Sequence, residues 1–91
     1  MTITEYRSVE DDYAAARQIR DRLSEQGEKS AAAELENTMK TFRTTASEAL
    51  GEIKLSLLNV RPIVEKALDN DTLHLLDSAV TGATKLFNAG G

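Results

Sequence analysis

The sequence contains no cysteine and no tryptophan, and it has only one proline and five glycines in 91 residues. The absence of cysteine excludes a disulfide framework and thiolate chemistry, and it fits a reducing compartment. No apolar run approaches the roughly 18 residues that a membrane-spanning helix needs. Residues 1–12 lack the charged start and apolar run of a secretory signal. We therefore expect a cytoplasmic protein that does not enter a membrane.

Basic residues are also scarce, with 11 Lys and Arg against 15 Asp and Glu, for a net charge of −4. The negative charge is divided evenly between the two halves, so no basic patch is available for phosphates. We expect no nucleic-acid partner for the chain on its own. Apolar residues make up 41% of the sequence, but many of them are alanine. This composition predicts a single domain, residues 1–91, with a thin hydrophobic core.

The shortage of glycine and proline, with abundant Ala, Leu, Glu, Lys and Arg, favours helix nearly throughout. Gly27 marks one helix end, because glycine readily adopts the left-handed conformation found there. Pro62 marks a second break, because it lacks the amide proton that a continuing helix needs. A third break falls at 69–71, where Asn70 or Asp71 can cap the next helix. The predicted helices are approximately 4–26, 28–59, 62–69 and 71–88.

The second of these helices has a possible break of its own. Thr45, followed three residues later by Glu48, has the form of a capping box, which starts a helix. Against this, one apolar stripe continues through the segment at helical spacing. Its members are Leu35, Met39, Phe42, Ala46, Ala49, Ile53, Leu57 and Val60. We therefore expect a continuous helix, and an all-α fold: a small antiparallel bundle of three to four helices around this long central one.

Apolar residues also lie outside these stripes. Gly51, Leu55 and Leu58 form a short seam at i, i+4 and i+7, on the face opposite Ile53 and Leu57. The last helix has a stripe that is widened by further apolar residues. The stripe is Leu73, Leu76, Val80, Ala83 and Phe87, and Leu75, Ala79 and Leu86 widen it. A thin core cannot cover all of this apolar surface, so we predict that oligomerisation completes the fold. The predicted interface comprises Gly51, Leu55, Leu58, Leu75, Ala79 and Leu86.

Arg20 interrupts the apolar stripe of the first helix. This stripe consists of Tyr6, Val9, Tyr13, Ala16, Ile19 and Leu23. The simpler interpretation is that the aliphatic part of Arg20 covers apolar surface while its guanidinium reaches water. The alternative is an ion pair with a carboxylate of a partner chain.

His74 is the only histidine, which makes it the first candidate for acid–base or metal chemistry. Asp71 and Asp77 flank it at helical spacing. A metal site, however, needs three or four ligands, and helical spacing puts His74 on the polar side of its helix. We therefore predict no metal site, no catalytic residue and no cofactor.

The sequence favours a protein–protein interaction module, a small adaptor or assembly subunit that is not an enzyme. Its expected partner is a second copy of the chain, another protein, or both. One alternative is a small acidic neutralising partner, such as an antitoxin that wraps a basic toxin. An alternative of another class is a metal-dependent or ligand-binding enzyme centred on His74.

Overall fold

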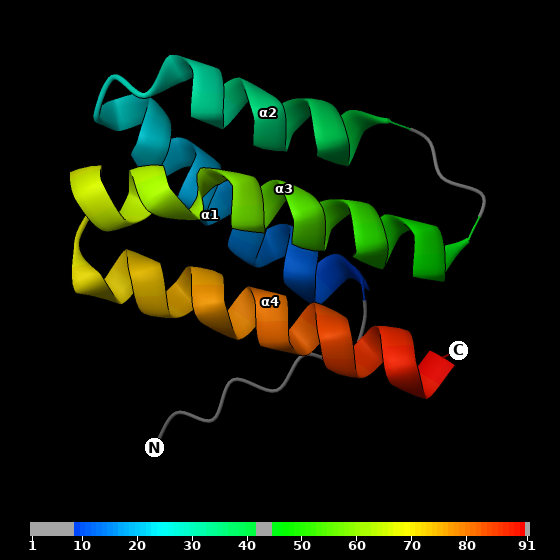
Figure 1. Ribbon diagram of the computed structural model, residues 1–91. Coiled ribbons are helices and arrows are strands. Elements are labelled where there is room, and N and C mark those ends of the chain that lie inside the picture. Colours follow the sequence, from blue (N-terminus) through cyan, green and yellow to red (C-terminus); the bar gives the residue numbers. More distant parts are fainter. Residues whose placement is uncertain (1–8, 42–44, 91) are drawn as a thin grey trace.

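The computed structural model describes residues 9–41 and 45–90, and within them the chain is entirely helical, without strands (Figure 1). These residues form four helices: α1 (Val9–Glu25), α2 (Lys29–Lys40), α3 (Ala46–Ala67) and α4 (Asn70–Gly90). The predicted all-α fold is confirmed at this level. The parts of the predicted stripes at Tyr6 and Phe42, and the start of the first predicted helix, lie outside the described residues.

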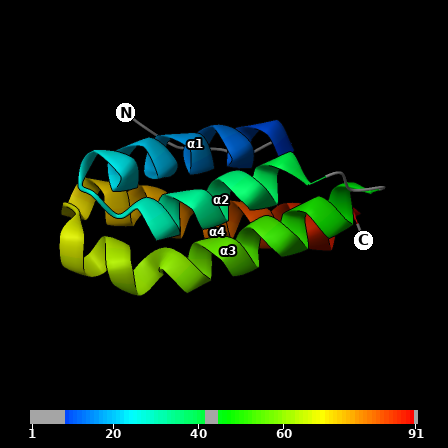
Figure 2. The same ribbon diagram turned by 90° about the horizontal axis from the view of Figure 1, so that it is seen from above.

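Successive helices run in opposite directions (Figure 1). α3 contacts α1, α2 and α4, whereas in the described part of the chain α2 and α4 do not contact each other. α1 and α3 therefore contact each other across the thin dimension of the molecule, with α2 and α4 at its two edges (Figure 2). The result is a flat molecule, 36 × 34 × 17 Å, whose two broad faces are centred on α1 and α3.

The turn after α1 is the one that the sequence predicted. Gly27 has a φ of 83°, which costs glycine little because it has no Cβ. The amide of Glu28 donates to the carbonyl of Leu23 at 2.9 Å, and the amide of Gly27 donates to that of Ser24 at 3.1 Å. These two hydrogen bonds form a Schellman motif, which satisfies carbonyls at the helix end.

The expected continuous helix 28–59 is wrong, because the chain leaves the helix after Lys40 and starts another at Ala46. Thr45 is the N-cap of α3: its extended backbone has φ −132° and ψ 157°, and its side chain accepts a hydrogen bond from the amide of Glu48 at 3.1 Å. The capping box therefore prevails over the unbroken stripe. The break lets α3 fold back against α2 and α1, so that both parts of the stripe contribute to the same core.

The predicted break at Pro62 is also wrong, since α3 continues through it to Ala67. Proline in a helix interior typically costs about 3 kcal/mol, because it removes one hydrogen bond and crowds the preceding turn. Here Pro62 is exposed, while Val60 and Val64 on either side of it are buried in the core. Burial of these valines offsets the cost, and the carbonyl that loses its partner, that of the exposed Leu58, lies on the solvent side.

α4 begins where the sequence predicted a break, but with a different capping residue. Asp69, rather than Asn70 or Asp71, accepts the amide of Thr72 at 2.9 Å and its hydroxyl at 2.6 Å. These hydrogen bonds hold the pKa of Asp69 below its ordinary value. Arg22 of α1 donates to the same Thr72 hydroxyl at 2.7 Å, which fixes the end of α1 against the start of α4.

The core draws on all four helices, and alanine supplies five of its thirteen buried members. Its buried members are Ala15, Ala16, Ile19, Leu23, Ala31, Ala32, Leu35, Ile53, Leu57, Val60, Val64, Leu76 and Ala79. Ile53 and Leu57 are fully buried, as predicted. Alanine brings helix axes close together, but each one buries little apolar area. Polar contacts therefore help to fix the positions of the helices. One of them joins Thr38 of α2 to Ser56 of α3 at 2.5 Å.

Candidate interaction face on α3

The outward side of α3 carries an apolar seam in the middle of one broad face. Gly51, Leu55, Leu58 and Pro62 follow one another at intervals of four, three and four residues, which places them on one side of a helix. Leu55 is 58% exposed and Leu58 is 42% exposed. Two leucines at such exposure leave apolar area in contact with water. We call these four residues the α3 seam.

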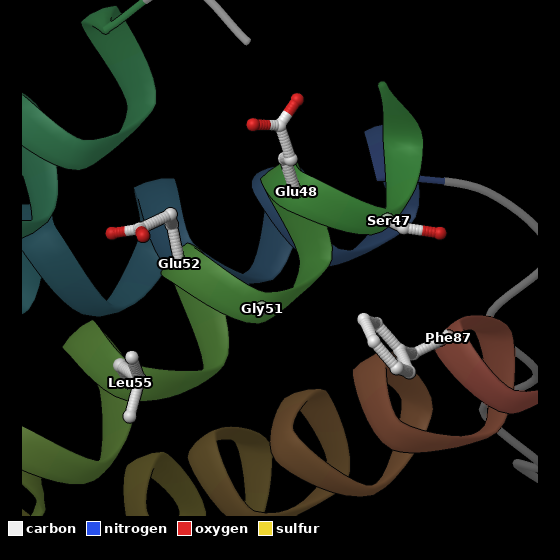
Figure 3. A pocket seen from close by; sticks show the side chains of 6 residues that line it. All are labelled: Ser47, Glu48, Gly51, Glu52, Leu55 and Phe87. Atoms are coloured by element: carbon white, nitrogen blue, oxygen red, sulfur yellow. The ribbon is translucent and has the colours of Figure 1, made fainter. Parts of the chain in front are cut away.

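Phe87 of α4 extends this apolar surface beyond α3. Its side chain is 45% exposed, although the sequence placed it in the core-facing stripe of its helix. The ring points toward Ser47 and Gly51 across the gap between α3 and α4 (Figure 3).

Two shallow hollows flank Phe87 and meet at Gly51. The larger, of about 500 Å³, is open to solvent, and its lining combines the seam with polar groups: Ser47, Glu48, Gly51, Glu52, Leu55 and Phe87 (Figure 3). The smaller, of about 290 Å³, is lined by Leu50, Gly51, Lys54, Ala83, Thr84, Phe87 and Asn88. A protruding side chain from another molecule would find an apolar floor here with a polar rim.

Gly51 is not required by packing inside the described part of the molecule. A Cβ built at this position meets no atom within 4 Å, and the backbone there is helical. Glycine within a helix is about 1 kcal/mol less favourable than alanine. Glycine at this position therefore gives the protomer no visible packing advantage. It would, however, permit the close approach of a second backbone.

The opposite broad face, centred on α1, has a different chemistry. Its exposed residues in the described chain are mostly charged or polar: Glu10, Asp11, Ala14, Arg17, Gln18, Asp21 and Glu25. Exposed leucines and phenylalanine occur on the α3 side alone among the described residues. The two faces have similar breadth, so this difference singles out the α3 side as the surface for contact with another molecule.

The other residues of the predicted interface are distributed differently. Ala79 is fully buried in the core of the protomer, so it cannot reach a second protein. Leu75 is half-buried and packs against the core, and Leu86 is also half-buried. The face that the sequence assigned to an interface on the last helix is therefore used largely inside the molecule, because α1 and α3 cover it.

His74 is exposed, as the helical spacing predicted, and so is Asp71. Asp77 is engaged by Arg61 of α3 through two hydrogen bonds, which lower the pKa of its carboxyl group. Within the described ranges no three His, Cys, Asp or Glu side chains come together as metal ligands would. The structure therefore does not assemble a centre around His74 from these residues.

Arg20 pairs with carboxylates of its own chain, which neither interpretation of the sequence included. Its guanidinium donates to Glu36 of α2 at 2.6 Å and also pairs with its neighbour Asp21. These hydrogen bonds raise its already high pKa. The carboxylate that it meets belongs to the same chain, so this residue ties α1 to α2.

Asp12 is the chemically unusual residue that the sequence analysis missed. It has 0% exposure, and among the described residues neither carboxylate oxygen has a hydrogen-bond partner. Burial, with a smaller contribution from the charge of Asp11, raises its pKa from 3.8 to about 7. The signal was present in the sequence: Asp12 precedes Ala16, Ile19 and Leu23 at i, i+4, i+7 and i+11. The predicted apolar stripe passed through Tyr13 instead, so Asp12 was not assigned to the buried face of the helix.

The contact between Arg22 and Thr72 indicates which part of α4 lies opposite Asp12. α1 and α4 are antiparallel (Figure 1), so counting about ten residues along each from this contact reaches Asp12 on one helix and Gly82 on the other. Gly82 and its neighbour Ala83 are both buried.

No family model, curated protein or solved structure matches this chain. None of the helices in the described ranges combines the length and apolar character of a membrane span. The functional argument therefore depends on the chain's own surfaces.

Proposed function

We propose that this protein is a protein–protein interaction module, a small adaptor or assembly subunit that acts by binding and catalyses no reaction. Its binding surface is the α3 seam together with Phe87. The observation that supports this is the grouping of three exposed large apolar side chains, Leu55, Leu58 and Phe87, on one of the two broad faces. The absence of cysteine supports a cytoplasmic location.

The geometry of the seam favours a helical partner. Apolar residues at intervals of four and three residues match the ridges that a second helix presents. Glycine at one end of the seam permits close approach, and the hollow of about 500 Å³ beside it accepts a side chain. Charged side chains around the rim, such as Glu48 and Glu52, add selectivity more than affinity.

The test is the double substitution Leu55→Glu plus Leu58→Glu. Both side chains are substantially exposed, so the helical circular dichroism should be retained. Association should be lost, because unpaired carboxylates buried in an apolar contact are costly. The measurements are light scattering after size exclusion, and capture of proteins from the native host followed by mass spectrometry.

A matched control adds the same charge to the opposite face, with Ala14→Glu plus Gln18→Glu. Both of these positions are exposed on α1. The control should keep every association of the wild-type protein. If the Leu55 and Leu58 variant kept its oligomeric mass and its captured partners, the proposed binding surface would be wrong.

A further inference from the structure

We propose that the occupant of the α3 face is a second copy of this chain, with the two α3 helices packed antiparallel about a two-fold axis that passes between Leu55 and Leu58. This inference rests on the proposed function, because it names the partner of the same surface. Three features support it: the spacing of the seam, the position of two charges, and the breadth of the face.

The α3 seam is self-complementary in an antiparallel arrangement. When Leu55 of one copy lies opposite Leu58 of the other, two-fold symmetry places the reverse pair alongside it. The same register sets Gly51 opposite Pro62 of the other copy at both ends. The rigid proline ring then meets the position without a side chain, next to the larger hollow. Both exposed leucines become covered.

The charges beside the seam are complementary in the antiparallel arrangement. Glu48 and Lys66 are separated by five helical turns at about 3.6 residues per turn, so both project from the same side of α3, about 27 Å apart along its axis. Both are exposed. Antiparallel pairing brings Glu48 of each copy beside Lys66 of the other, twice by symmetry.

The breadth of the face leaves room for a dimer contact of standard size. The broad face measures 36 by 34 Å, and a standard interface buries about 800 Å² on each partner. The direction of the helices adds a smaller contribution, since antiparallel dipoles attract.

The first experiment is light scattering after size exclusion over a range of protein concentrations. The wild-type chain should have twice its 9.9-kDa mass at micromolar concentration. Gly51→Ala should keep its helical circular dichroism and raise the melting temperature of the dissociated chain, because alanine favours helix and its Cβ meets open space. The same substitution should raise the dimer dissociation constant about tenfold or more, since the Cβ holds off the facing Pro62.

The second experiment determines the direction of pairing. The chain has no cysteine, so Glu48→Cys and Lys66→Cys each introduce a single thiol. A short bismaleimide should cross-link a mixture of the two variants at least tenfold faster than it cross-links either variant alone. Circular dichroism of each variant checks that α3 is retained. A mixture of the Lys66→Cys and Thr45→Ser variants is the control, because only one of its two proteins carries a thiol.

Three outcomes would overturn the inference, and they bear differently on the proposed function. A wild-type chain that stays monomeric, yet captures a defined protein through Leu55 and Leu58, overturns the second copy and leaves the binding surface standing. A dimer that dissociates in the Leu55→Glu plus Leu58→Glu variant, but cross-links fastest within each single-cysteine variant, overturns the antiparallel arrangement alone. A dimer that survives the two glutamates overturns both proposals.

Discussion

Arg61 of α3 holds Asp77 of α4 through two parallel hydrogen bonds, from Nε to Oδ1 at 2.8 Å and from Nη2 to Oδ2 at 3.1 Å. This bidentate geometry is stronger and more directional than a single ion pair. It joins the two helices that flank the hollows around Phe87. The contact therefore fixes the relative position of α3 and α4, on which the shape of the interaction face depends.

Asp77→Asn should reduce the free energy of unfolding by about 1 kcal/mol, because both partners are partly exposed and solvent screens their attraction. Arg61→Lys should also reduce the free energy of unfolding, since lysine cannot form the paired hydrogen bonds. The two changes together should cost less than their sum. Urea denaturation of the single and double variants measures this coupling, and strict additivity would show that the two side chains act independently.

The stability of the protein should fall as the pH rises from about 4 to about 7, because of Asp12. Its pKa is 3.8 in the unfolded chain and about 7 in the folded one. Between these values the folded state binds more protons than the unfolded state, so each step up in pH favours unfolding. Above pH 7 this contribution is constant. Urea denaturation at pH 5, 6, 7 and 8 measures the trend.

Asp12→Asn should remove that part of the pH dependence and make the protein more stable than wild type at pH 8. The control is Asp11→Asn, which removes only the smaller of the two causes of the raised pKa and should reduce the pH dependence slightly. Equal slopes for wild type and Asp12→Asn between pH 5 and pH 8 would contradict the assignment to this carboxyl group.

Thr45→Ala should destabilise the protein by about 1 kcal/mol, because the amide of Glu48 loses its capping hydroxyl. Thr45→Ser keeps a hydroxyl in the same position and should restore most of the stability. Thermal unfolding followed by circular dichroism compares the three proteins. An alanine variant as stable as wild type would mean that the start of α3 depends on core packing alone.

His74→Ala should change the free energy of unfolding by less than about 0.5 kcal/mol, as expected for an exposed side chain. Metal analysis of the purified wild-type and variant proteins after dialysis completes the test. Loss of a stoichiometric metal on substitution would favour the alternative of an enzyme centred on this histidine.

Local chemistry in the sequence determined the helical content and two of the turns. The shortage of glycine and proline predicted helix correctly, and Gly27 ended α1 in the left-handed conformation that its lack of a Cβ allows. The stretch 69–71 likewise contained a break. The opposed positions of Leu55 and Ile53 on α3 were also correct, because helical periodicity alone separates an exposed side chain from a buried one.

Tertiary packing decided the structure where local sequence signals conflicted. At Thr45 a cap competed with a continuous apolar stripe, and the cap prevailed because folding α3 back against α2 buries both parts of the stripe in one core. At Pro62 the local penalty was outweighed by the burial of Val60 and Val64. The burial of Ala79 and Asp12, and the exposure of Phe87, depended on which helices lie opposite them. Periodicity along one helix assigns side chains to faces, but only the neighbouring helices determine which faces are covered.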